Sequence, residues 1–100
     1  MTGMTAVAEW FRRNCDGDWE HQHGVRIHSL DNPGWALEID IGDTNLVGVP
    51  FERVAIEATD DDWMVCVVEA GVFKGHCSVS HLERMLAVFL EWAAANRSRQ

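Results

Sequence analysis

Residues 24–41 read GVRIHSLDNPGWALEIDI, and they contain two runs in which apolar and polar residues alternate around one turn. The alternation predicts two strands, each with one buried face, because successive side chains of a strand point to opposite sides. The buried face of the second strand is expected to consist of Trp35, Leu37, Ile39 and Ile41. Between the runs, Pro33 fixes φ near about −65° and Gly34 tolerates the positive φ that a type II turn needs next. The segment therefore predicts an antiparallel hairpin.

Further strands and a first helix are expected on both sides of this hairpin. Residues 5–14 have the apolar spacing of a helix, with Thr5 as its cap. Residues 53–58 alternate and predict a strand, whereas residues 63–70 are apolar on both faces and predict a central or helix-covered strand. Residues 71–77 are expected to form a loop with at most one short edge strand.

The C-terminal helix has the strongest pattern of any single element. Ser80 and Glu83 have the spacing of a capping box, and Arg97 and Arg99 stand near the end, where the helix dipole favours cations. An apolar stripe follows the cap at Leu82, Met85, Leu86, Phe89, Leu90 and Ala93. The turns at 31–34 and 60–62 are too short for parallel crossovers. The predicted fold is a single α+β domain, residues 1–100, with a four-stranded, mainly antiparallel sheet flanked by an N-terminal and a C-terminal helix.

Negative charge is concentrated in the middle of the chain. The formal net charge is −8, and residues 16–62 hold twelve carboxylates against Arg26 and Arg53, a local charge of −10. Such a region attracts basic proteins and repels nucleic acid and anionic membranes, so neither of these is an expected partner. The sequence has no apolar run of about 20 residues and no secretory signal, which predicts a cytoplasmic protein.

Histidines and cysteines are the candidate metal ligands and catalytic groups. Cys15, His21 and His23 lie close in sequence, and His76 and His81 flank Cys77 in a second group. Neither group has the paired spacing of structural zinc sites, and the carboxylates around Cys15 disfavour a thiolate. No nucleophile elbow or phosphate loop is present, so neither catalysis nor a cofactor is expected. The alternative hypothesis is a small metal-binding protein or enzyme that uses Cys15, His21 and His23.

Trp19 is the least easily placed of the five tryptophans. It lies between Asp18 and Glu20 in a segment without a period, whereas Trp10 and Trp35 follow an apolar pattern typical of core residues. Trp19 is expected either to pack as a lid over the sheet edge or to act as an anchor for a partner, because tryptophan is enriched in interface hot spots.

Several short segments carry a resemblance to a known family. They are CDGDWEH at 15–21, GVRI at 24–27, LDNPGW at 30–35, DW at 62–63, FKG at 73–75 and LAVFLEW at 86–92. With these segments, the chain resembles the immunity protein 53 family of bacterial polymorphic toxin systems over nearly its whole length. The resemblance implies a cytoplasmic antitoxin that binds and blocks a cognate toxin without catalysis, and a toxin gene directly upstream. The acidic charge favours a basic toxin, for instance a nuclease.

Polar residues around the hairpin are the expected contact surface for the toxin. The candidates are Asp16, Asp18, Glu20, His21, Asp31, Asn32, Asp40 and Asp43, all from the acidic region. A structural role is the competing interpretation. Asp31 and Asn32 would then bond the turn backbone, and Glu20 and His21 would pair to hold the segment around Trp19. Both interpretations are compatible with the sequence.

Overall fold

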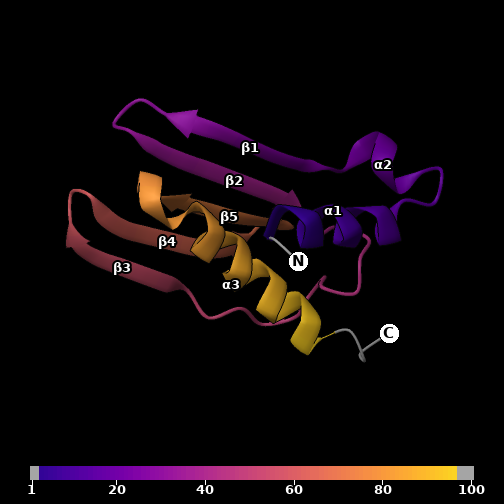
Figure 1. Ribbon diagram of the computed structural model, residues 1–100. Coiled ribbons are helices and arrows are strands. Elements are labelled where there is room, and N and C mark those ends of the chain that lie inside the picture. The colour runs from indigo at the N-terminus through magenta and orange to yellow at the C-terminus, as the bar shows by residue number, and fades with distance from the viewer. Residues whose placement is uncertain (1–2, 97–100) are drawn as a thin grey trace.

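The structure, a computed structural model, describes residues 3–96. The elements in chain order are α1 (Gly3–Asn14), α2 (Trp19–Gln22), β1 (Val25–Leu30), β2 (Gly34–Asp40), β3 (Val54–Thr59), β4 (Asp62–Glu69), β5 (Val72–Cys77), the 3-10 turn η1 (Val79–His81) and α3 (Leu82–Ala95). The strands form one antiparallel sheet in the order β1-β2-β5-β4-β3. Helices α1 and α3 lie on the same face of that sheet (Figure 1).

The predicted α+β class with a helix at each end is confirmed, but the sheet has five strands rather than four. The segment predicted to be a loop, residues 71–77, forms β5, which lies in the centre of the sheet between β2 and β4. This strand could not be predicted because of Gly75, since glycine has no apolar side chain to continue the alternation of apolar and polar residues. The glycine is there for packing, since a Cβ at Gly75 would lie 2.6 Å from Sδ of Met85 in α3.

The hydrophobic core lies between the sheet and the two long helices. Phe73 of β5 packs edge-to-face on Phe89 of α3 with ring centroids 5.2 Å apart, and Phe89 in turn contacts Trp10 of α1 at 5.0 Å. Leu37 and Ile39 of β2 are fully buried beneath them. Aromatic pairs of this geometry stabilise a fold beyond the contribution of their buried area. One aromatic cluster therefore joins both helices to the central strands.

The predicted hairpin is confirmed, although its turn and part of its buried face differ. Leu37, Ile39 and Ile41 are buried as expected, but Trp35 is only half-buried. The Asn32–Pro33 peptide bond is cis, and Gly34 has no positive φ, so the predicted type II turn is wrong. Gly34 is required for a different reason, because a Cβ there would collide with the backbone carbonyl oxygen of Cys77.

The predicted capping box at the start of the C-terminal helix does not form. Helix α3 begins at Leu82 after the 3-10 turn, and its N-cap residue His81 makes no side-chain capping hydrogen bond. Glu83 Oε1 instead accepts a hydrogen bond from the backbone N–H of Gly3 at 3.1 Å. The carboxylate therefore joins the first turns of α1 and α3 rather than capping its own helix.

The other predicted helix ends are also corrected or lie outside the described residues. Helix α1 begins at Gly3, so Thr5 lies within its first turn rather than at its cap. Arg97 and Arg99 fall outside residues 3–96. None of the helices in that described range has both the length and the apolar character needed to cross a membrane.

We predict that Gly34→Ala lowers the free energy of unfolding by about 1–3 kcal/mol, the usual range for forcing an extra methyl group into a packed site. The matched control is Gly24→Ala, because nothing lies within 4 Å of a Cβ at Gly24. Urea unfolding of both variants tests the prediction. Equal stability of the two variants would show that the contact with Cys77 relaxes without loss.

Candidate partner-binding surface

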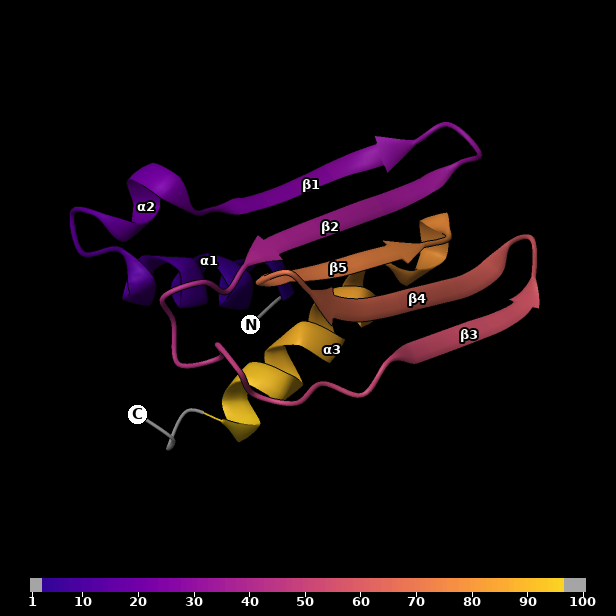
Figure 2. The ribbon, with the colours of Figure 1, turned by 180° about the vertical axis from the view of Figure 1, so that it is seen from behind.

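Within residues 3–96, no helix covers the face of the sheet that lies away from α1 and α3 (Figure 2). Because strand side chains alternate, the neighbours of the buried residues point to this side. We call this surface the open face; it is formed by Arg26, His28, Ala36, Glu38, Asp40, Ala55, Glu57, Trp63, Val65, Val67, Glu69, Val72, Lys74 and His76. Residues 63–70 were predicted to form a central or helix-covered strand, and β4 does lie inside the sheet between β5 and β3. Its side chains Trp63, Val65 and Val67 are half-buried on the open face.

Basic residues on the open face are paired with carboxylates of the same face. Arg26 donates from Nε to Glu38 at 3.1 Å and from its terminal nitrogens to both oxygens of Asp40 at 3.0 and 3.2 Å. Lys74 pairs with Glu69 at 3.0 Å. Of the four carboxylates on this face, Glu57 is the one without a basic partner within residues 3–96.

Asp40 has a structural role that its place in the sequence did not reveal. Its side chain is only 15% exposed and accepts a hydrogen bond from the backbone N–H of Gly24 at 2.8 Å, in addition to the bonds from Arg26. Hydrogen bonds from Arg26, the largest cause, and from Gly24 outweigh desolvation and hold the pKa of Asp40 below its usual range. This carboxylate fixes the open end of the hairpin.

Asp16 and Glu20 organise the loop that precedes α2. Asp16 Oδ1 accepts hydrogen bonds from the backbone N–H groups of Asp18 and Trp19, both at 2.9 Å. Glu20 accepts from the backbone N–H groups of Asp16 at 3.0 Å and Gly17 at 2.9 Å. These backbone bonds lower the pKa of Asp16, with Trp19 the main donor, and the pKa of Glu20, to which its own N–H contributes most.

Neither of the structural pairings proposed from the sequence is found. Glu20 bonds backbone N–H groups rather than His21, whose side chain is exposed. Asp31 and Asn32 are exposed in the β1–β2 turn, and their side chains make no hydrogen bond within residues 3–96. The backbone-bonding role therefore belongs to Asp16 and Glu20, at the other end of the hairpin.

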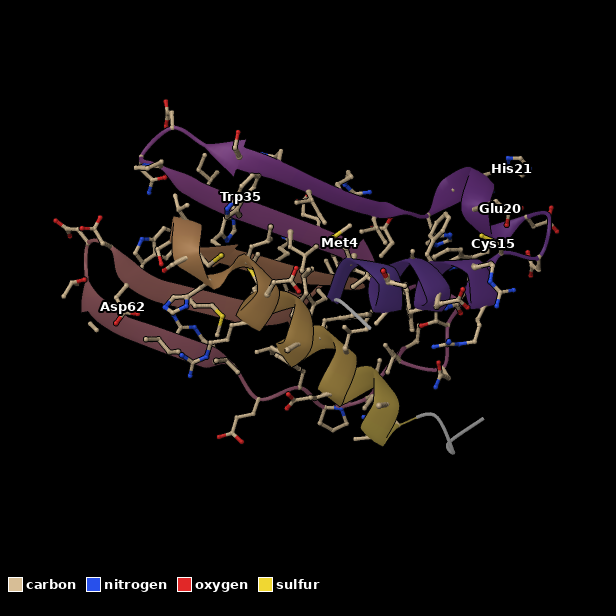
Figure 3. All side chains as sticks on the ribbon, in the orientation of Figure 1. Met4, Cys15, Glu20, His21, Trp35 and Asp62 are labelled. Carbon is tan, nitrogen blue, oxygen red and sulfur yellow. The ribbon has the colours of Figure 1, made fainter. Side chains whose placement is uncertain are left out.

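The eight candidate residues form two groups rather than one. Asp16, Asp18, Glu20 and His21 lie around α2, and Asp40 and Asp43 lie at the same end of the hairpin, whereas Asp31 and Asn32 occupy the β1–β2 turn (Figures 1 and 3). Strands of six and seven residues, at about 3.3 Å per residue, separate the two groups by roughly 20 Å. Of the group near α2, Asp16, Asp18, His21 and Asp43 are exposed.

Trp19 is a core residue and not a partner-facing anchor. It is 5% exposed, and its indole Nε1 donates to the carbonyl of Gly42 at 2.8 Å. Its ring packs edge-to-face on Trp10 at 5.9 Å and stacks on the His23 imidazole at 5.4 Å. Trp19 therefore closes the end of the core as the predicted lid.

A pocket of about 590 Å³ lies where the β1–β2 turn meets strands β3 and β4. We call it the turn-end pocket; it is lined by Asn32, Glu57, Ala58, Thr59, Asp60, Trp63 and Val65. Asn32 was predicted to contact the partner, but the other residues of the pocket were not predicted, because the register of β3 and β4 shifts between Glu57 and Thr59. The run of aspartates before Trp63 was the one available signal for this site.

Metal-ligand groups suggested by the sequence do not converge. Cys15 lies before α2, His21 is exposed on that helix, and His23 is its C-cap residue. In the second group, His76 is exposed on the open face while His81 pairs with a carboxylate of β4. Within residues 3–96, no set of three or more histidine, cysteine or acidic side chains is arranged to hold a metal ion.

All three thiols have environments that favour the protonated form. Desolvation is the main cause that raises the pKa of Cys15, followed by the carboxylates of Glu20 and Asp16. Burial raises the pKa of Cys66 to about 12 and that of Cys77 to about 11. Because the thiolate is the reactive form, these side chains serve as packing groups.

The fold and the surface define a small acidic α+β domain with one uncovered sheet face. Comparison with protein families matches residues 4–94 to Immunity protein 53. The match covers most of the chain, and the protein belongs to the immunity protein 53 family, as the sequence resemblance predicted. No curated protein and no solved structure matches it significantly.

We predict that Asp40→Asn lowers the free energy of unfolding by about 1–3 kcal/mol at neutral pH, because it removes a partner from charged hydrogen bonds. The folded-state pKa is depressed, so the stabilisation is fully present above the unfolded pKa of about 3.9 and is lost as the pH falls through the folded value. The difference from the wild type should therefore shrink in acid.

Urea unfolding as a function of pH measures this difference. Asp43→Asn is the control, because the Asp43 side chain is 85% exposed. A pH-independent difference, or an equal loss in the control, would contradict the structural role of Asp40.

Proposed function

We propose that this protein is the immunity protein of a bacterial polymorphic toxin system. It binds a cognate toxin in the cytoplasm and blocks it by steric and electrostatic occlusion. Membership of the immunity protein 53 family supports the class, and the formal net charge of −8 favours a basic toxin, such as a nuclease whose active site must hold phosphate. Occlusion requires neither a cofactor nor a catalytic residue in this chain.

The observation that carries the proposal is the uncovered, acidic sheet face. Half-buried Trp63, Val65 and Val67 provide apolar area in its middle, and its two basic residues are already paired. A rigid sheet loses little conformational entropy on binding, which preserves affinity. Complementary charge speeds association with a basic partner.

A standard interface buries about 800 Å² on each partner. An interface of this area can extend beyond the open face to both ends of the hairpin. We assign direct contacts to the exposed members of the predicted set whose side chains do not bond the backbone, namely Asp18, His21, Asp31, Asn32 and Asp43. Asp16, Glu20 and Asp40 belong to the same contact region, where they hold the backbone in place and contribute negative potential.

Co-expression with the toxin domain encoded directly upstream tests this function. The wild-type protein is expected to restore growth of cells that express the toxin domain and to elute with it as one complex in gel filtration. Toxicity that persists with well-expressed wild-type protein, together with no complex, would overturn the proposal.

We predict that the double variant Asp18→Asn/Asp43→Asn slows association with the toxin about 3- to 10-fold at low salt and weakens the salt dependence, because steering depends on charge near the contact. Asparagine is chosen since Asp43 has a φ of +60°, which asparagine tolerates. Stopped-flow measurement of the association rate over a range of salt concentrations provides the data.

The control is Glu9→Gln/Glu91→Gln, which removes the same charge from exposed or partly exposed positions on α1 and α3. Equal association rates of the two double variants would place the contact away from the end of the hairpin near α2.

A further inference from the structure

We infer that the turn-end pocket binds an arginine side chain of the toxin. This inference rests on the proposed function, and it specifies which chemical group of the toxin binds at the turn end of the open face. It is drawn from two features of the pocket, which are an indole ring packed against Gly34 and carboxylates without a basic partner within residues 3–96. The pocket also adjoins the contact region, since Asn32 lines it.

Trp63 provides the first feature, because its backbone is bonded to Ser78 and its ring lies against Gly34. Its backbone carbonyl accepts a hydrogen bond from the N–H of Ser78 at 2.9 Å, and its own N–H donates to the Ser78 hydroxyl at 3.3 Å. Ser78 is only 2% exposed. The edge of the indole lies against Gly34, where a Cβ would be 3.4 Å from Cζ2. The backbone of Trp63 is therefore held in place, and the edge of its ring packs against the hairpin at Gly34.

Glu57 and Asp60 provide the second feature. Glu57 is the cross-strand neighbour of Trp63, and Asp60 follows in the β3–β4 turn. Arg26 and Lys74 are paired with other carboxylates of the open face, and within residues 3–96 neither Glu57 nor Asp60 has an ion-pair partner. The pocket thus has an excess of negative charge beside an aromatic ring.

This combination matches a guanidinium group better than other ligands. A guanidinium stacks on an indole face through a cation–π contact and forms paired hydrogen bonds with carboxylates in the same plane. The amide of Asn32 lines the same pocket and can accept a further bond. Anions are repelled by Glu57 and Asp60, and a second copy of this chain carries a net charge of −8.

The test compares two double variants that remove the same charge from neighbouring positions. Glu57→Gln/Asp60→Asn alters the pocket, whereas Glu52→Gln/Asp61→Asn alters exposed carboxylates that do not line it. Calorimetry with the upstream toxin domain is expected to give about 10- to 100-fold weaker binding for the pocket variant, in the range of a hot spot, and less than about threefold for the control.

A second measurement uses a probe that does not depend on the toxin. N-acetyl-arginine amide is titrated into ¹⁵N-labelled protein while the indole N–H resonance of Trp63 is followed, with N-acetyl-citrulline amide as the neutral comparison. The arginine compound alone is expected to shift the resonance, and Trp63→Leu, checked for folding by thermal unfolding, should abolish saturable shifts of the neighbouring amides of β3.

The outcomes separate this inference from the proposed function. Tight wild-type binding with equal affinity of both double variants would overturn the arginine site while leaving the immunity function intact. Failure of the wild type to bind the toxin would overturn the function, and the titration then decides on the pocket alone: a selective shift supports it and no shift overturns it. Self-association that Glu57→Gln/Asp60→Asn abolishes would make a second copy the occupant and would also overturn the inference.

Discussion

The close contact between Gly75 of β5 and Met85 of α3 determines which side of the sheet is covered. It lets α3 lie directly on the central strand, and Phe73 and Phe89 extend the same contact toward α1. Both long helices consequently lie on one face, where the aromatic cluster forms the core (Figure 1). Antiparallel sheets can leave their other face in water, so this single packing arrangement creates the open face.

The open face combines features that a binding surface for a basic protein needs. Its basic residues are neutralised within the sheet, its middle is apolar, and its turn end places Trp63 beside Glu57 and Asp60. Where the chain could have been mobile, at the loop before α2, backbone hydrogen bonds to Asp16 and Glu20 hold it in place. The acidic charge is thus displayed on a rigid body, which favours both fast association and a small entropy loss.

Local patterns were sufficient for the fold class but not for the centre of the sheet. The hairpin and the C-terminal helix could be predicted because their periodicity is contained in neighbouring residues. Strand β5 could not be predicted, since glycine is needed at position 75 only because Met85 of a distant helix packs directly against it. Likewise, composition located the acidic region, but the role of each carboxylate within it depends on residues distant in sequence. Asp40 bonds Gly24 and Arg26, and Glu57 lies opposite Trp63 on the adjacent strand.

The toxin is expected to occupy the face of the sheet that the helices leave uncovered. Cross-saturation NMR of the complex, with the toxin domain irradiated, tests this expectation most directly. We expect attenuated methyl signals for Val65 and Val67 of β4, with the signals of Met4 and Leu90 on the helix side unchanged. The opposite pattern, attenuation at Met4 and Leu90 alone, would contradict the account.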